Sequence, residues 1–165
     1  ISFYQSIIRP AWTRLELGLG ADVWKEARQR FSSTVMGPHF EHVCREYVAS
    51  SGAAAFDEPV GAVGSGAVND PGARLQIDVD VVVLAPAEGT ERRRIVSLGE
   101  AKWGKVMGIR HLNRLRRARE LLGARGWDVE DTVLACYSGA DFDDELRAEA
   151  ASGRARLVGL EDLYG

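Results

Sequence analysis

The chain has 165 residues and a mass of 18.0 kDa, a length that predicts one domain, with or without an appendage. Its 45% hydrophobic and 27% charged residues exclude a collagen, a coiled coil and a wholly disordered chain. No apolar run approaches the roughly 20 residues that cross a bilayer, so we expect no membrane span. Two cysteines, Cys44 and Cys136, are too few for a disulfide scaffold, and we expect a reducing, cytoplasmic setting.

Charge is distributed unevenly along the chain, although the net charge is only -3. Residues 92–125 carry eleven Lys and Arg side chains against Glu100 and Glu120. Residues 128–149 carry eight acidic side chains against Arg147. A basic block of this kind is typical of a surface that binds a polyanion. A solvated helix face explains it equally well.

The first third of the chain is predicted to be helical. Apolar residues recur at helical spacing over 21–31, and Gly37-Pro38 indicates a break followed by a helix start. An amphipathic helix then runs to about Gly52. The chain begins at Ile1 rather than at a methionine, so we expect a further region upstream in the gene product.

The middle of the chain changes to a period of two, which is typical of strands. We predict strands over 60–68, 74–84 and 95–103, with a turn at 69–72 between the first two. Strands that follow one another this closely form an antiparallel meander.

The last third alternates helices and strands. We predict a helix over 104–126, a strand over 131–137, a helix over 142–151 and a strand over 156–160. A strand, a helix and a further strand require a parallel, right-handed crossover. The fold class is therefore α/β, with a mixed sheet flanked by helices.

Two carboxylates occur at strand positions that are otherwise apolar. Asp78 interrupts the second predicted strand, and Glu100 with Lys102 lies at the end of the third. Side chains two residues apart share a face, so Glu100 and Lys102 project together and Asp78 can project beside them. Carboxylate oxygens suit Mg²⁺ or Mn²⁺, and the carbonyl of Ala101 offers a third ligand. Such a site predicts hydrolysis of phosphodiesters, with Lys102 orienting water or stabilising the transition state.

The same residues carry a resemblance to a known family. A helix with Glu41, a strand with Asp78, the run Glu100-Ala101-Lys102, and then a helix and a strand resemble the PD-(D/E)XK nuclease superfamily. More closely, three segments are similar to the C-terminal domain of unknown function of archaeal-type and bacterial AAA+ (P-loop) ATPases. These segments are Gly37-Pro38-His39-Phe40-Glu41-His42-Val43-Cys44-Arg45-Glu46-Tyr47, Gln76-Ile77-Asp78-Val79 and Leu98-Gly99-Glu100-Ala101-Lys102-Trp103. The resemblance covers roughly residues 1–137.

The resemblance implies a restriction-endonuclease-like αβββαβ core over residues 34–165, preceded by a helical extension or linker over 1–33. It implies that Asp78, Glu100 and Lys102 hold the nuclease positions, that Glu41 holds the acidic position on the helix, and that a P-loop ATPase domain lies upstream.

The sequence departs from the family pattern on the second predicted strand. Gln76 stands where the family tends to have a glutamate, which leaves one possible ligand neutral. Asp80 is an additional acid on the same face as Asp78. It is a substitute ligand, a supporting residue or a solvent-facing side chain.

Glu41 also has two interpretations. It faces the carboxylates, or it forms a surface pair with Arg45 one helical turn later. Glu46 lies about 140° from Glu41 around the helix, so only one of the two can face the site.

The arginine-rich helix is the candidate nucleic-acid surface. Arg110, Arg114 and Arg117 lie where they can follow a phosphate backbone, since each neutralised phosphate releases counterions. DNA is the favoured substrate.

Three hypotheses follow from the sequence. The first is a metal-dependent nuclease domain of a larger ATPase. The second is a catalytically silent domain of the same fold that docks nucleic acid or a partner in that ATPase. The third is a structural C-terminal cap that mediates assembly, and the oligomeric state itself is left open by the sequence.

Overall fold

A computed structural model describes residues 1–87 and 93–164, with residues 52–55 described by their backbone alone. Its centre is a five-stranded sheet in the order β1-β2-β3-β4-β5. The strands are β1 (Ala62–Asp70), β2 (Leu75–Leu84), β3 (Ile95–Lys102), β4 (Val133–Ser138) and β5 (Arg156–Val158). The first three strands pair antiparallel, whereas β4 runs parallel to β3 and β5 runs parallel to β4. The predicted meander, crossover and mixed sheet are confirmed.

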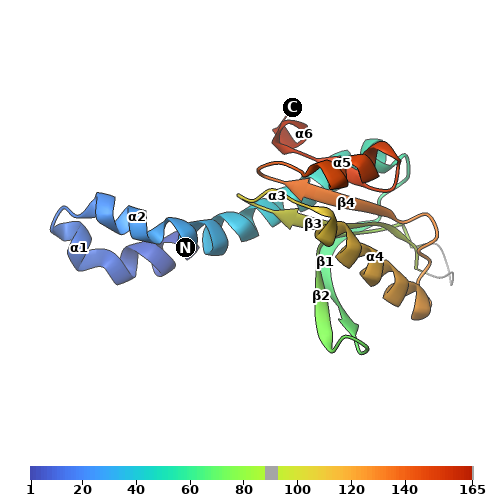
Figure 1. Cartoon of the computed structure of the whole chain (residues 1–165), viewed down its shortest axis with the longest axis horizontal. Helices are drawn as coiled ribbons and strands as arrows, with labels where there is room; N and C mark the ends of the chain where they lie inside the picture. Colours follow the sequence, from blue (N-terminus) through green and yellow to red (C-terminus); the bar gives the residue numbers. More distant parts are fainter. Residues whose placement is uncertain (88–92, 165) are drawn as a thin grey trace.

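Helices surround the sheet and precede it (Figure 1). They are α1 (Trp12–Glu16), α2 (Gly20–Phe31), α3 (Gly37–Phe56), α4 (Ile109–Ala124), α5 (Asp144–Ala151) and α6 (Leu160–Tyr164), with irregular helical turns at Tyr4–Ile8, Arg9–Ala11 and Ser32–Met36. The core order α3-β1-β2-β3-α4-β4 is the expected αβββαβ order. Across the described residues, none of these helices combines the length and the apolar character needed to span a bilayer.

Two predicted elements are shorter than expected. The helix predicted over 104–126 begins only at Ile109, because Gly104 has a φ of +70° and Gly108 is extended. Residues 103–108 therefore form a loop directly after β3. The last predicted strand ends at Val158, and the chain turns into α6 at Leu160.

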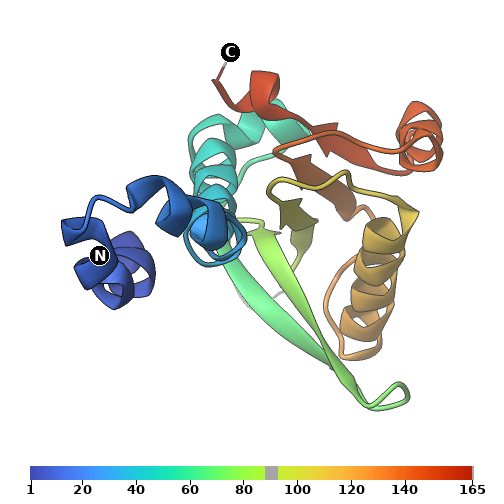
Figure 2. The same ribbon diagram turned by 60° about the vertical axis from the view of Figure 1, so that its left-hand side comes forward.

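The sheet is covered on both faces, with α3 on one side and α4 on the other (Figure 2). The α3 side buries Phe40, Cys44, Val48, Val81, Val83, Val96, Ala101 and Tyr137 together. The α4 side buries Leu112, Leu115, Ala118, Ile77, Val79, Leu98, Leu134 and Cys136. Strand β2 contributes Ile77 and Val79, with the half-buried Val82 and Leu84, to the α4 cluster, and it contributes Val81 and Val83 to the α3 cluster.

The N-terminal helices form an arm that projects from the sheet (Figure 1). An ion pair of 2.7 Å between Nη1 of Arg14 on α1 and Oε2 of Glu26 on α2 holds these two helices of the arm together. The break predicted at Gly37-Pro38 is absent, since α2 continues through the turn Ser32–Met36 into α3. Proline lacks an N–H for the hydrogen bonds of a helix. A wider helical turn precedes it, in which the N–H of Gly37 donates to the carbonyl of Ser32, five residues back, and the helix continues.

Gly99 on β3 gives a direct test of this packing. A Cβ there would lie 2.6 Å from Cε2 of Tyr137 and 3.1 Å from Cβ of Val81, both of which are buried. We expect Gly99→Ala to lower the free energy of unfolding by about 1–3 kcal/mol through overpacking. Chemical denaturation measures the change. Gly64→Ala on β1 is the control, because nothing lies within 4 Å of its Cβ position, and a loss as large as that of Gly99→Ala would contradict the packing described.

Candidate active site

The most unusual side chain of the sheet is Glu100, a carboxylate only 1% exposed near the end of β3. Its Oε1 accepts a hydrogen bond from Nη1 of Arg114 at 3.1 Å and lies 3.3 Å from Nζ of Lys102. Its Oε2 is buried and accepts no hydrogen bond from any described group. A buried acceptor without a hydrogen-bond donor destabilises the folded state. A positive charge or a donor placed next to Oε2 would therefore be stabilising.

Asp80 of β2 completes the cluster. Its Oδ2 accepts the N–H of Ala101 at 2.9 Å and lies 3.8 Å from Nζ of Lys102. The pairing of β2 with β3 runs from Leu84 only as far as Val81, opposite Gly99. Beyond this point the N–H of Ala101 is free for a side chain, and Asp80 is the next residue along β2. Lys102 therefore lies between two carboxylates from neighbouring strands.

Asp78 lies outside this cluster. It is exposed, its Oδ1 accepts a hydrogen bond from Nε2 of Gln76, and its strand partner is Ala67 of β1. Two residues along a strand span about 6.6 Å, and Asp78 belongs to the part of the hairpin that continues past β3 (Figure 1). The structure thus brings Asp80, rather than Asp78, to Lys102.

Glu41 of α3 faces the same cluster. Partial burial, followed by the negative charge of Asp80, raises the pKa of its carboxyl group, and the charges of Lys102 and Arg45 partly offset this. The Arg45 side chain donates to the carbonyl of Asp80 at 2.7 Å. Helix α3 therefore places one acidic side chain, Glu41, and one basic side chain, Arg45, beside Asp80.

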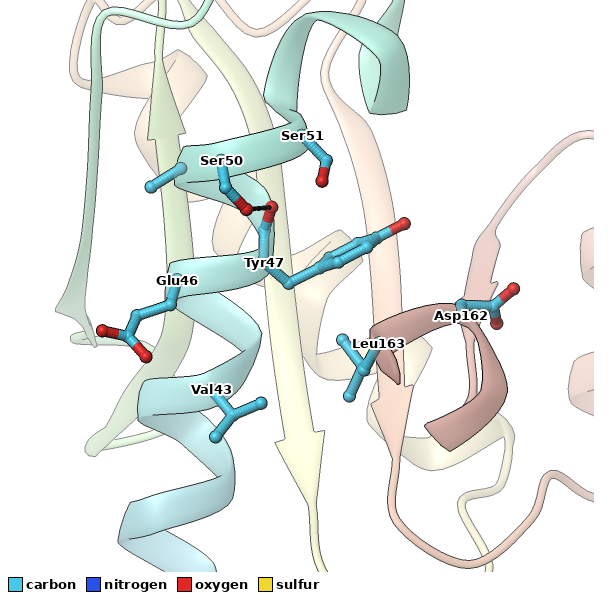
Figure 3. A pocket seen from close by; sticks show the side chains of 8 residues that line it. Val43, Glu46, Tyr47, Ser50, Ser51, Asp162 and Leu163 are labelled. Carbon is cyan, nitrogen blue, oxygen red and sulfur yellow. Dashed lines mark hydrogen bonds between the residues drawn. The ribbon is translucent and has the colours of Figure 1, made fainter. Parts of the chain in front are cut away.

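Glu46 faces a different part of the surface. It lies 3.3 Å from His42 and lines a hollow between α3 and α6, together with Tyr47 and Asp162 (Figure 3). Of the two glutamates of α3, Glu41 is the one near the carboxylates of the sheet.

The residues present are suited to a divalent cation, although they do not form a complete cage. Asp80 and Glu100 offer carboxylate oxygens beside a common amine, and Oε2 of Glu100 has no donor. Hard cations prefer such oxygens. Within residues 1–87 and 93–164, no three His, Cys, Asp or Glu side chains converge closely enough to hold a metal by themselves. The third expected ligand, Ala101, contacts Asp80 through its N–H.

The three predicted nucleic-acid contacts of α4 differ in their surroundings. Arg114 binds Glu100, as described. Arg117 binds Asp70 through two hydrogen bonds, at 2.6 and 3.0 Å, and so fastens the β1–β2 hairpin to α4. Arg110 is exposed and forms no ion pair with another described residue.

The Asp70 carboxylate is the centre of that fastening. Hydrogen bonds from Arg117 are the main cause that lowers its pKa to about 2, and the N–H groups of Gly72 and Ala73 contribute. Asp70 and Arg117 are therefore structural partners in this fold.

The two cysteines lie away from solvent. Cys44 and Cys136 are buried and free, and burial raises the pKa of each thiol to about 12. Since the thiolate is the reactive form, the raised pKa disfavours both thiols as nucleophiles.

Comparisons with known proteins give one distant structural neighbour. No protein-family model and no curated protein matches the chain. Among solved structures, the chain is similar to the crystal structure of AF1548, a protein of unknown function, with a TM-score of 0.49 and 15% identity. The match covers 74% of this chain and 62% of that chain.

The raised pKa of Glu41 predicts a pH-dependent cost to stability. At neutral pH the charged form is less favoured in the folded state than in the unfolded state, so Glu41→Gln should raise Tm at pH 7. Below about pH 4 the glutamate is protonated in both states and the gain should vanish. Asp70, with a pKa of about 2, stays ionised at that pH and keeps the hairpin fastened.

Thermal unfolding at several pH values measures this effect. Glu46→Gln on the same helix is the matched control, and its exposed side chain predicts a change within about 0.5 kcal/mol at either pH. A Glu41→Gln variant that is less stable than the wild type at pH 7 would show that Glu41 is not in an unfavourable site.

Proposed function

We propose that the chain is the nuclease-like domain of a larger P-loop ATPase and hydrolyses phosphodiester bonds of nucleic acid, DNA in preference to RNA, with Mg²⁺ or Mn²⁺. The observation that carries the proposal is the buried Glu100, whose Oε2 has no donor, beside Asp80 and Lys102. The motif resemblance and the αβββαβ order support it. The free, buried thiols agree with a reducing, cytoplasmic location.

The carboxylates of this site would hold the cation. Asp80 and Glu100 come from neighbouring strands and are fixed by backbone and side-chain contacts, so their positions are set before any ligand arrives. When bound, Mg²⁺ or Mn²⁺ polarises a phosphate oxygen and lowers the pKa of water.

Lys102 and Glu41 have separate roles in the proposed reaction. The Lys102 ammonium lies within 4 Å of both Asp80 and Glu100, where it orients the attacking water and stabilises charge that develops on the phosphate. Burial and the charge of Asp80 raise the pKa of Glu41, so its ionised carboxylate is a stronger base than that of an ordinary glutamate. It is suited to accept a proton from that water.

A second candidate function is a silent domain that docks nucleic acid or a partner for the ATPase. The observation in its favour is that Lys102 and Arg114 already neutralise the charges of Asp80 and Glu100. This alternative predicts salt-dependent DNA binding that survives Asp80→Asn and weakens with Arg110→Gln.

Substitutions on β2 and β3 separate the proposed active site from its surroundings. Asp80→Asn and Lys102→Ala should each reduce Mn²⁺-dependent cleavage of DNA by about 100- to 1000-fold, as the loss of one charge-stabilising group usually does. Asp78→Asn is the matched control, because this exposed aspartate is two residues away and binds only Gln76 among the described side chains. Initial rates on a labelled oligonucleotide measure the effect.

Two results would contradict the proposal. One is a wild-type protein that cuts neither single- nor double-stranded DNA, nor RNA, with Mn²⁺ or Mg²⁺. The other is an Asp78→Asn variant as inactive as Asp80→Asn, with both still folded by circular dichroism.

A further inference from the structure

The contact between Arg114 and Glu100 points to a further property of the proposed site, and the inference drawn from it rests on the proposed function. We infer that Arg114 is a built-in cation that occupies Glu100 in the metal-free protein, competes with the divalent ion, and is drawn away by a substrate phosphate. Arg114 is thus a positioning residue that couples metal binding to substrate binding.

The place of Arg114 on α4 makes it suited to two positions. Leu112 and Leu115 on either side are fully buried and fix the helix against the sheet. The Arg114 side chain is 45% exposed, yet its guanidinium reaches a carboxylate that is 1% exposed. The Arg114 side chain is therefore placed to reach either the buried carboxylate of Glu100 or the solvent.

The charges at the site explain why the Arg114 guanidinium leaves Glu100 when a divalent cation binds. Asp80 and Glu100 carry two negative charges, and Lys102 and Arg114 carry two positive ones. Glu41 and Arg45, which lie beside Asp80, add one charge of each sign and leave this sum at zero, so an approaching divalent cation meets no net attraction. Once Arg114 is released, Asp80, Glu100 and Lys102 together carry one negative charge, and the charge of the site favours the cation.

Arg114, rather than Lys102, is the group that can be released. Lys102 contacts both Asp80 and Glu100, so its departure would break two ion pairs. Arg114 contacts Glu100 alone among the described carboxylates. Its guanidinium matches the geometry of a phosphate, and exposed Arg110 lies one helical turn away on the same face.

Removal of Arg114 should therefore strengthen metal binding. We expect Arg114→Gln to bind Mn²⁺ at least about fivefold more tightly than the wild type, within the usual range of coupling between two sites. Arg114→Lys keeps a cation at this position and should stay near the wild-type affinity. Arg110→Gln, on the same exposed face, should not change it.

Isothermal titration of the full chain with Mn²⁺ alone measures these affinities without reference to cleavage. Glu100→Gln serves as the site control and should abolish the binding gained by Arg114→Gln. An Arg114→Gln variant with wild-type or weaker Mn²⁺ affinity, or with no binding at all, would overturn the inference.

The outcome also separates this inference from the proposed function. If Arg114→Gln binds Mn²⁺ more tightly through Glu100 but no nucleic acid is cleaved, the competition is supported and the nuclease proposal fails. If the wild type cleaves DNA but Arg114→Gln does not gain Mn²⁺ affinity, the nuclease proposal stands and the competition is refuted.

Discussion

The buried charge of Glu100 is the constraint on which the site depends. A carboxylate that is 1% exposed is destabilising unless cations or hydrogen-bond donors compensate for the lost water. Lys102 of the same strand and Arg114 of α4 supply that compensation to one oxygen, and the other oxygen is left without a donor. The protein therefore keeps a buried carboxylate oxygen without a donor inside its sheet, which is uncommon among buried polar atoms.

Each layer of the fold contributes to holding this carboxylate. Ala101, the neighbour of Glu100, packs into the α3 cluster while its N–H binds Asp80. On the other face, α4 is held against the sheet by its buried leucines and by the ion pair of Arg117 with Asp70. The same helix that closes the hydrophobic core thus delivers one cation to the site and another to the hairpin.

The sequence predicted the fold more fully than the site, and the reasons are physical. Period-two patterning correctly predicts the strands, and the two-residue spacing predicts that Glu100 and Lys102 share a face. The two-residue spacing cannot distinguish Asp78 from Asp80, because both side chains lie on one face of β2. Only the register, in which Val81 pairs with Gly99, shows that Asp80 is the one beside β3. The partners of Arg114 and Arg117 lie 14 and 47 residues away, so a local count of charges gives no sign of these pairs.

The proposed cation site requires that Asp80 and Glu100, from two neighbouring strands, bind one divalent cation beside Lys102. The most direct measurement is the anomalous scattering of a crystal of this chain soaked in Mn²⁺. We expect a manganese peak within about 2.2 Å of carboxylate oxygens of both Asp80 and Glu100. A fully soaked crystal with no peak at these two residues, or with manganese bound only elsewhere on the molecule, would contradict it.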